Sequence, residues 1–144
     1  MPAGYSSTPL LKKLGIKAGM MMHQRFAPVS YNESLGQLPE AAQWTEQAEA
    51  GQCDFVHAFY QRETDFIQDL AELKELLKMD GILWLSWPKK SAKMETDLNR
   101  EIIREKGLAI GLVDVKVCAV DEKWSGLKFV YRLKDRPKAT KRKG

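Results

Sequence analysis

Two lysines and a serine follow a strongly apolar segment near the middle of the chain. Gly81 to Trp87 is apolar and aromatic, and Pro88 then introduces Lys89, Lys90 and Ser91. In open α/β sheets, ligands bind outside the carboxyl ends of the strands. We therefore predict that the end of this strand carries a site for a small anionic ligand, such as a phosphate or a carboxylate. The predicted ligand-binding residues are Trp87, Lys89, Lys90 and Ser91, and the alternative is an exposed surface loop.

Other reactive residue types form no catalytic or metal-binding pattern. His23 and His57 lie inside segments that resemble strands and have no Ser, Cys or Asp motif beside them, so we predict hydrogen-bonded structural roles. Cys53 and Cys118 lie in apolar segments far apart in the chain, which favours small buried side chains. The chain contains no nucleophile elbow, P-loop or dinucleotide fingerprint. We predict no catalytic residues and no metal ligands.

Local patterns predict the elements that position this strand end. Apolar residues three and four positions apart make 62–79 the clearest helix. Ser30 begins a capping box and Thr96 precedes an acidic first turn, so both are expected to cap helices. Asp80 and Gly81 are expected to form a turn before the central strand. The predicted helices are 9–14, 31–36, 62–79 and 97–106, and the predicted strands are 20–26, 43–46, 53–60, 82–87, 113–120 and 124–133.

The order of these elements predicts the fold class. Alternating strands and helices are typical of a parallel α/β sheet with right-handed crossovers. The last two strands are joined by only a few residues, which indicates an antiparallel hairpin at or near a sheet edge. We predict a three-layer, Rossmann-like α/β domain of the methyltransferase-like type, mostly parallel with a C-terminal antiparallel hairpin. The path of residues 27–52 is the least determined part.

Charge is distributed unevenly along the 144 residues. Residues 134–144 carry six basic residues against one acidic residue, a net +5, which leaves residues 1–133 at −1 of the total +4. We predict a flexible segment at 1–7, one domain at 8–133 and a disordered basic tail at 134–144. The body alone gives no reason to expect nucleic acid, whereas the tail could bind it through salt-sensitive contacts.

Location is predicted from what the chain lacks. No apolar run approaches the roughly 20 residues that a membrane helix needs. Residues 1–13 show no pattern of a secretory signal peptide. A cytoplasmic protein without a membrane partner is the expectation.

Five segments of the sequence carry a resemblance, and they are Gly4 to Leu10, Lys12 to Lys17, Ser86 to Lys90, Gly111 to Asp121 and Trp124 to Lys128. They resemble a family of short bacterial proteins classed as a domain of unknown function. The resemblance implies a compact methyltransferase-like fold and a bacterial, cytoplasmic origin, and it brings no activity or catalytic residues with it.

The methyltransferase-like pattern raises the question of S-adenosylmethionine. Domains of this type place a glycine-rich turn after the first strand, where the backbone approaches the ligand closely. Here no glycine follows Phe26 until Gly36, and Pro28 removes one N–H donor. Glu46 or Glu49 is the candidate carboxylate for a ribose at the second strand. The cofactor is possible but disfavoured.

Three functions are consistent with the sequence. The favoured one is a non-enzymatic or degenerate methyltransferase-like domain that binds a small anionic ligand or a protein partner. The alternatives are an S-adenosylmethionine-dependent methyltransferase with an atypical cofactor turn and a nucleic-acid-associated protein that acts through its tail.

Overall fold

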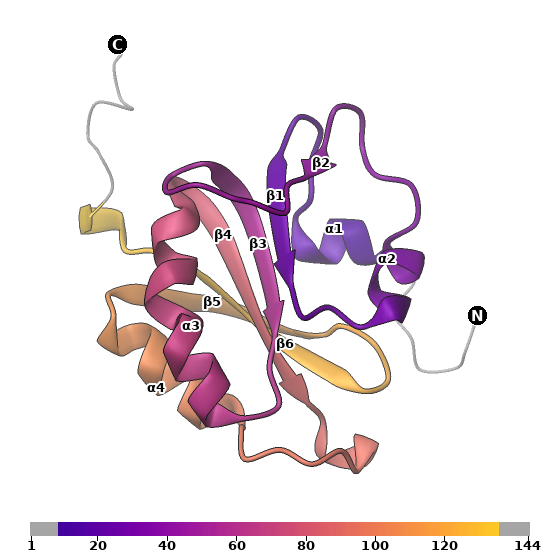
Figure 1. The fold of residues 1–144 in the computed structure, drawn as a ribbon, viewed down its shortest axis with the longest axis vertical. Coiled ribbons are helices and arrows are strands. Elements are labelled where there is room, and N and C mark those ends of the chain that lie inside the picture. The colour runs from indigo at the N-terminus through magenta and orange to yellow at the C-terminus, as the bar shows by residue number, and fades with distance from the viewer. Residues whose placement is uncertain (1–8, 136–144) are drawn as a thin grey trace.

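A six-stranded sheet lies between two helical layers in the computed structural model, which describes residues 9–135 (Figure 1). The strand order is β2-β1-β3-β4-β6-β5, with the first four parallel and β6 antiparallel to both β4 and β5. This confirms the predicted fold class, including the hairpin at the sheet edge. The strands are β1 (Met21–Arg25), β2 (Gln43–Trp44), β3 (Cys53–Phe59), β4 (Leu77–Pro88), β5 (Leu112–Ala119) and β6 (Trp124–Tyr131). The α-helices are α1 (Leu10–Leu14), α2 (Val29–Leu35), α3 (Glu63–Leu76) and α4 (Arg100–Ala109), and the 3-10 helices are η1 (Lys90–Ala92) and η2 (Leu133–Asp135).

The two faces of the sheet bury separate apolar clusters. Residues of α3 and α4 pack with Val56, Leu83 and Trp87 on one face. Residues of α1 and α2 pack with Phe55 and Trp84 on the other. Trp84 and Trp87 therefore point to opposite faces, as their spacing along β4 predicts. Trp84 also donates a hydrogen bond from Nε1 to the carbonyl oxygen of Leu14 at 2.8 Å, which fixes α1 on the sheet.

The central strand begins earlier than predicted. Helix α3 ends at Leu76, and β4 starts at the next residue and runs through Asp80 and Gly81. The expected turn at Asp80 and Gly81 is wrong. The pairing of β3 with β4 is irregular between Cys53 and Phe55, and the extra residues of β4 are accommodated there. A Cβ on Gly81 would lie 2.9 Å from the carbonyl oxygen of Cys53, so this close approach of two strands needs glycine.

Two predicted helix caps are also corrected. Helix α2 begins at Val29 after Pro28, so Ser30 lies inside the helix instead of capping it. Helix α4 begins at Arg100, and its cap is Asn99, whose side chain accepts a hydrogen bond from the N–H of Ile102 at 2.9 Å. Thr96 does not cap α4. Its hydroxyl donates to the backbone carbonyl oxygen of Gln61, in the loop between β3 and α3, at 2.7 Å.

The N-terminal half of the sheet is shorter than the C-terminal half. Strand β2 has two residues, which pair with Met21 and Met22 at the start of β1. No helix separates β2 from β3, and residues 45–52 cross between them as a loop. The predicted flexible segment at 1–7 and most of the predicted tail lie outside the described residues, whereas Lys134 and Asp135 belong to η2. None of the helices within 9–135 is long and apolar enough to span a membrane.

Candidate functional site

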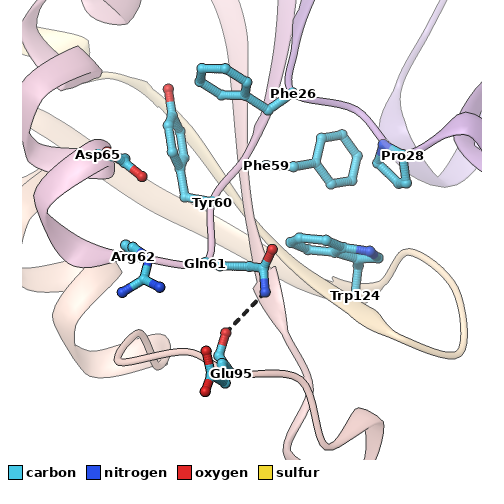
Figure 2. Close-up of a pocket in the computed structure, with 9 residues that line it drawn as sticks. All are labelled: Phe26, Pro28, Phe59, Tyr60, Gln61, Arg62, Asp65, Glu95 and Trp124. Carbon is cyan, nitrogen blue, oxygen red and sulfur yellow. Dashed lines mark hydrogen bonds between the residues drawn. The ribbon is translucent and has the colours of Figure 1, made fainter.

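A cavity of about 450 Å³ opens at the carboxyl ends of β1 and β3 (Figure 2). The chain leaves these adjacent strands in opposite directions, because β1 leads outward to β2 while β3 leads through α3 to β4. Such a reversal is a topological switch point, where open α/β sheets form their binding crevice. We call this space the switch-point cavity. Its lining residues are Phe26, Pro28, Phe59, Tyr60, Gln61, Arg62, Asp65, Glu95 and Trp124.

The exit from β1 presents an aromatic ring to this cavity. Phe26 has a φ of 60°, and its side chain is 67% exposed. A bulky residue in this left-handed region costs roughly 1–2 kcal/mol. Pro28 follows as the N-cap of α2 and has no N–H to offer. The turn after β1 therefore contains a strained phenylalanine and a proline. A glycine-rich turn at this place would instead let the backbone approach a ligand closely.

Four aromatic rings form the apolar part of the lining. The ring of Phe26 meets that of Tyr60 edge-to-face, with centroids 5.6 Å apart. Phe59 and Trp124 form a second edge-to-face pair at 5.2 Å. Figure 2 shows the two pairs on neighbouring sides of the cavity. Phe59, Tyr60 and Trp124 are buried, so Phe26 is the ring whose face is open to a flat ring or a cationic group.

The polar part of the cavity is closed by a loop from beyond β4. Gln61 donates from Nε2 to the backbone carbonyl oxygen of Glu95 at 3.0 Å, and the backbone carbonyl oxygen of Gln61 accepts from the Thr96 hydroxyl at 2.7 Å. The carboxylate of Asp97 accepts from the N–H of Glu63 at 2.7 Å, in the first turn of α3. The N-terminus of α3 is therefore already occupied by a carboxylate of the protein itself.

Charged groups at the rim carry mixed signs. Arg62, Asp65 and Glu95 line the cavity, and all three are exposed. Two carboxylates against one guanidinium give the rim a negative balance. The cavity consequently favours a neutral or cationic ligand over the small anion predicted for the basic loop.

An ion-pair network holds the end of β1 against α3. Arg25 contacts Glu72 at 2.9 Å and Asp69 at 3.7 Å. Tyr60 donates its hydroxyl hydrogen to Asp69 at 2.7 Å. Burial and the Asp69 carboxylate raise the pKa of Tyr60, and the hydrogen bond from Arg25 lowers the pKa of Glu72. Tyr60 is thus a fixed wall of the cavity and stays protonated, so it offers no general base.

His57 belongs to a buried network beneath the cavity. Its Nδ1 lies 2.8 Å from the Tyr31 hydroxyl, and its Nε2 lies 2.7 Å from Oγ of Ser86. All three side chains are buried, and burial lowers the pKa of His57 to about 3. The constellation contains a serine and a histidine in contact, but solvent does not reach it. His57 and His23 are both hydrogen-bonded residues of the sheet, as predicted.

The residues predicted to bind an anion lie at the end of β4, outside the switch-point cavity. Trp87 is buried against α3 and α4. Lys90 and Ser91 are exposed in η1, and Lys89 is partly buried, with its N–H donating to the carbonyl oxygen of Lys123 at 2.8 Å. The structure brings Lys89, Lys90 and Ser91 together in one short segment and directs Trp87 into the apolar cluster. Anion binding at this segment stays a prediction.

The glutamates predicted to bind a ribose do not reach the switch-point cavity. Strand β2 ends at Trp44 beside Met22, well before β1 ends at Arg25, and Glu46 follows as an exposed residue. Glu46 and Glu49 are absent from the lining. Within residues 9–135, no cluster of three His, Cys, Asp or Glu side chains offers a metal site.

The sequence does not single out the residues that do line the cavity. Phe26, Gln61 and Glu95 carry no motif. Their positions directly after β1 and β3, or in the loop after η1, are the only signal that could have found them. The site is therefore identified by its position at the ends of the strands and not by the types of its side chains.

Comparisons with known proteins agree with the geometry of the sheet. No family model matches the chain, and no curated protein matches it. Among solved structures, a SAM-dependent methyltransferase from Aquifex aeolicus has 15% identity and a TM-score of 0.54, over 83% of this chain and 86% of that one. A putative type 11 methyltransferase from Sulfolobus solfataricus has 10% identity and a TM-score of 0.60, over 89% and 92%. A putative methyltransferase of Haloferax volcanii, solved in complex with the Trm112 methyltransferase activator, has 10% identity and a TM-score of 0.57, over 84% and 86%.

Proposed function

We propose that this methyltransferase-like domain binds one small molecule with a flat ring, of the adenosine type, in the switch-point cavity. The observation that carries the proposal is the aromatic-walled cavity at the switch point. The exposed ring of Phe26 provides a face for a purine, and the buried rings of Tyr60 and Trp124 form part of the cavity lining. The carboxylates of Asp65 and Glu95 provide acceptors for hydroxyl groups.

Two observations bear on the choice between binding and catalysis. The turn after β1 presents Phe26 and Pro28, not glycines, which favours a degenerate domain. The similar structures include several methyltransferases, which favours methyl transfer over a non-enzymatic role. The cavity has a volume of about 450 Å³, within the range of small-molecule sites.

Methyl transfer is the second candidate function. It is favoured by the similar structures, which include a SAM-dependent methyltransferase and two methyltransferases solved with bound S-adenosylhomocysteine. In such a function, the sulfonium group of S-adenosylmethionine would lie among the aromatic rings, where cations are attracted to ring faces. A protein partner is a further possibility, because one of the similar methyltransferases was solved with a protein activator.

Calorimetry with adenosine, S-adenosylmethionine and S-adenosylhomocysteine tests both candidates. We expect Phe26→Ala to weaken binding, because it removes an exposed wall of the cavity. Val29→Ala is the matched control, because Val29 is exposed three residues later and does not line the cavity. A ligand present at about 100 times its dissociation constant should also stabilise the fold by about 2.7 kcal/mol.

Two outcomes would decide between the candidates. No heat and no thermal shift with any of the three compounds at millimolar concentration would refute the adenosine-type ligand. Transfer of a labelled methyl group from S-adenosylmethionine to an acceptor, lost in Phe26→Ala, would establish the methyltransferase instead.

A further inference from the structure

Lysines cross the sheet in a row on the face that α1 covers. Lys128 of β6 lies opposite Trp84 of β4, and Lys116 of β5 lies opposite Lys128. Directly opposed residues on antiparallel strands share a face. Trp84 belongs to the apolar cluster of α1 and α2, so both lysines lie on that same face, next to the buried region.

Further lysines join this row from distant parts of the chain. Lys116 donates from Nζ to the carbonyl oxygen of Lys13 at 3.3 Å, and Lys13 donates from Nζ to the carbonyl oxygen of Ala119 at 3.2 Å. Lys89 is linked through its N–H to Lys123, in the turn before β6. We call Lys13, Lys116 and Lys128 the lysine strip, with Lys17 and Lys89 at its margins, where their charges act on the pKa values of Lys128 and Cys118.

The lysine strip has no acidic partners within residues 9–135. The ion pairs there involve Arg25, Lys78 and Arg104, and none involves a member of the strip. Burial lowers the pKa of Lys128, and the charges of Lys116 and Lys17 lower it further. Burial raises the pKa of the Cys118 thiol, while Lys13, Lys116 and Lys89 act in the opposite direction. The charges that act on these two groups are all lysines.

Like charges directly opposed on neighbouring strands destabilise a sheet. Lys116 and Lys128 occupy such a position, and neither forms an ion pair with a carboxylate of residues 9–135. An anionic partner would relieve this repulsion. Lys89 follows the end of β4, five residues after Trp84, a span of about 17 Å at about 3.3 Å per residue, so a partner that contacts both Lys128 and Lys89 is extended. A single phosphate is too small to contact both ends.

We propose that the lysine strip binds the phosphodiester backbone of a nucleic acid. Successive phosphates match a linear array of ammonium groups, and the displaced counterions favour binding. Exposed aromatic rings are not part of the strip, so binding should depend on backbone charge and not on base sequence. The site is separate from the switch-point cavity.

This proposal differs from what net charge suggests. The body of the chain carries a formal charge of −1, and its lysines are scattered along the sequence. The lysines of the strip and its margins come from α1, from the turn before β1, from the segment after β4 and from the hairpin. The set of lysines includes Lys89, for which the sequence predicts anion binding.

Fluorescence anisotropy of the full chain with labelled oligonucleotides tests the proposal. The probes are single-stranded oligo-uridine RNA and oligo-thymidine DNA of about 20 nucleotides, longer than the strip. We compare K116Q/K128Q with R100Q/K106Q, which removes two positive charges from α4 on the opposite face. Losing two phosphate contacts should reduce the slope of log affinity against log salt by about 1.4. The control should retain the wild-type slope.

Each outcome bears on the proposal. An equal loss of affinity for RNA and for DNA in K116Q/K128Q supports the proposal. An unchanged or higher melting temperature of that variant also supports it. Wild-type affinity in K116Q/K128Q would overturn it and assign any binding to the basic residues after 133. Binding of labelled poly-glutamate without binding of either oligonucleotide would also overturn it, in favour of an acidic protein partner.

Discussion

At the scale of single residues, the most constrained group is the imidazole of His57. Tyr31 and Ser86 contact its two ring nitrogens, and the ring of Phe59 stacks on it with centroids 4.2 Å apart. No water-accessible path leads to this group, because all four side chains are buried. A histidine in this setting contributes to the pH dependence of folding and not to catalysis.

The chain should therefore lose stability in acid through His57. The pKa of His57 falls from about 6.5 to about 3 on folding, so the unfolded state binds a proton in this range that the native state excludes. The contribution is present in full above about pH 6.5 and is lost as the pH falls toward 3, at up to about 1.4 kcal/mol per pH unit. Urea unfolding of wild type and His57→Gln across this range measures it. Identical pH slopes in the two proteins would contradict the assignment.

At the scale of elements, the loop between η1 and α4 caps two helices. Residues after η1 cap α3 through Asp97, and Asn99 then caps α4. The sequence predicts a cap in this loop at Thr96, which is wrong in position. A cap between elements distant in sequence leaves no local pattern, since Asp97 and Glu63 are 34 residues apart.

We expect Asp97→Ala to destabilise the fold by about 0.5–2 kcal/mol, because the first turn of α3 loses its acceptor. Glu95→Ala is the matched control. It removes a carboxylate from the same loop, whereas the hydrogen bond at Glu95 uses the backbone carbonyl and is retained. Chemical denaturation measures both variants. If the two variants prove equally stable, Asp97 does not act as the cap.

The sequence predicts an element well when the interactions that form it lie between residues close together in the chain. Strands β3, β5 and β6 and helix α3 are found within a few residues, since apolar periodicity is local. The long β4 is missed at its start because the irregular pairing with Cys53 is a contact between strands. The switch-point cavity is missed as a set of residues, although its edge of the sheet is predicted. Its members share only their places after strand ends.

At the scale of the whole molecule, the sheet is uneven. Strands β3 and β4 lie at its centre with apolar clusters on both faces. Strand β2 is an edge of two residues attached to β1 alone. The methyltransferase-like folds of the compared structures confirm the architecture.

Native-state hydrogen exchange should reflect this asymmetry. Amides of β3 and the second half of β4 should exchange only with global unfolding, because both faces there are covered. Amides of β2 and α2 should exchange through local opening, at a lower free energy. The measurement is exchange at increasing denaturant followed by mass spectrometry. Equal protection of β2 and β3 would show that the edge is held as firmly as the centre.

The unequal burial of the two thiols has a practical consequence. Cys53 is fully buried where β3 begins, and burial raises its pKa to about 11. Cys118 is partly exposed in β5, among the lysines of the strip. The native chain thus offers a maleimide dye one reachable attachment point, and that point lies beside the proposed nucleic-acid surface. A fluorophore attached there would report on that surface without any engineered cysteine.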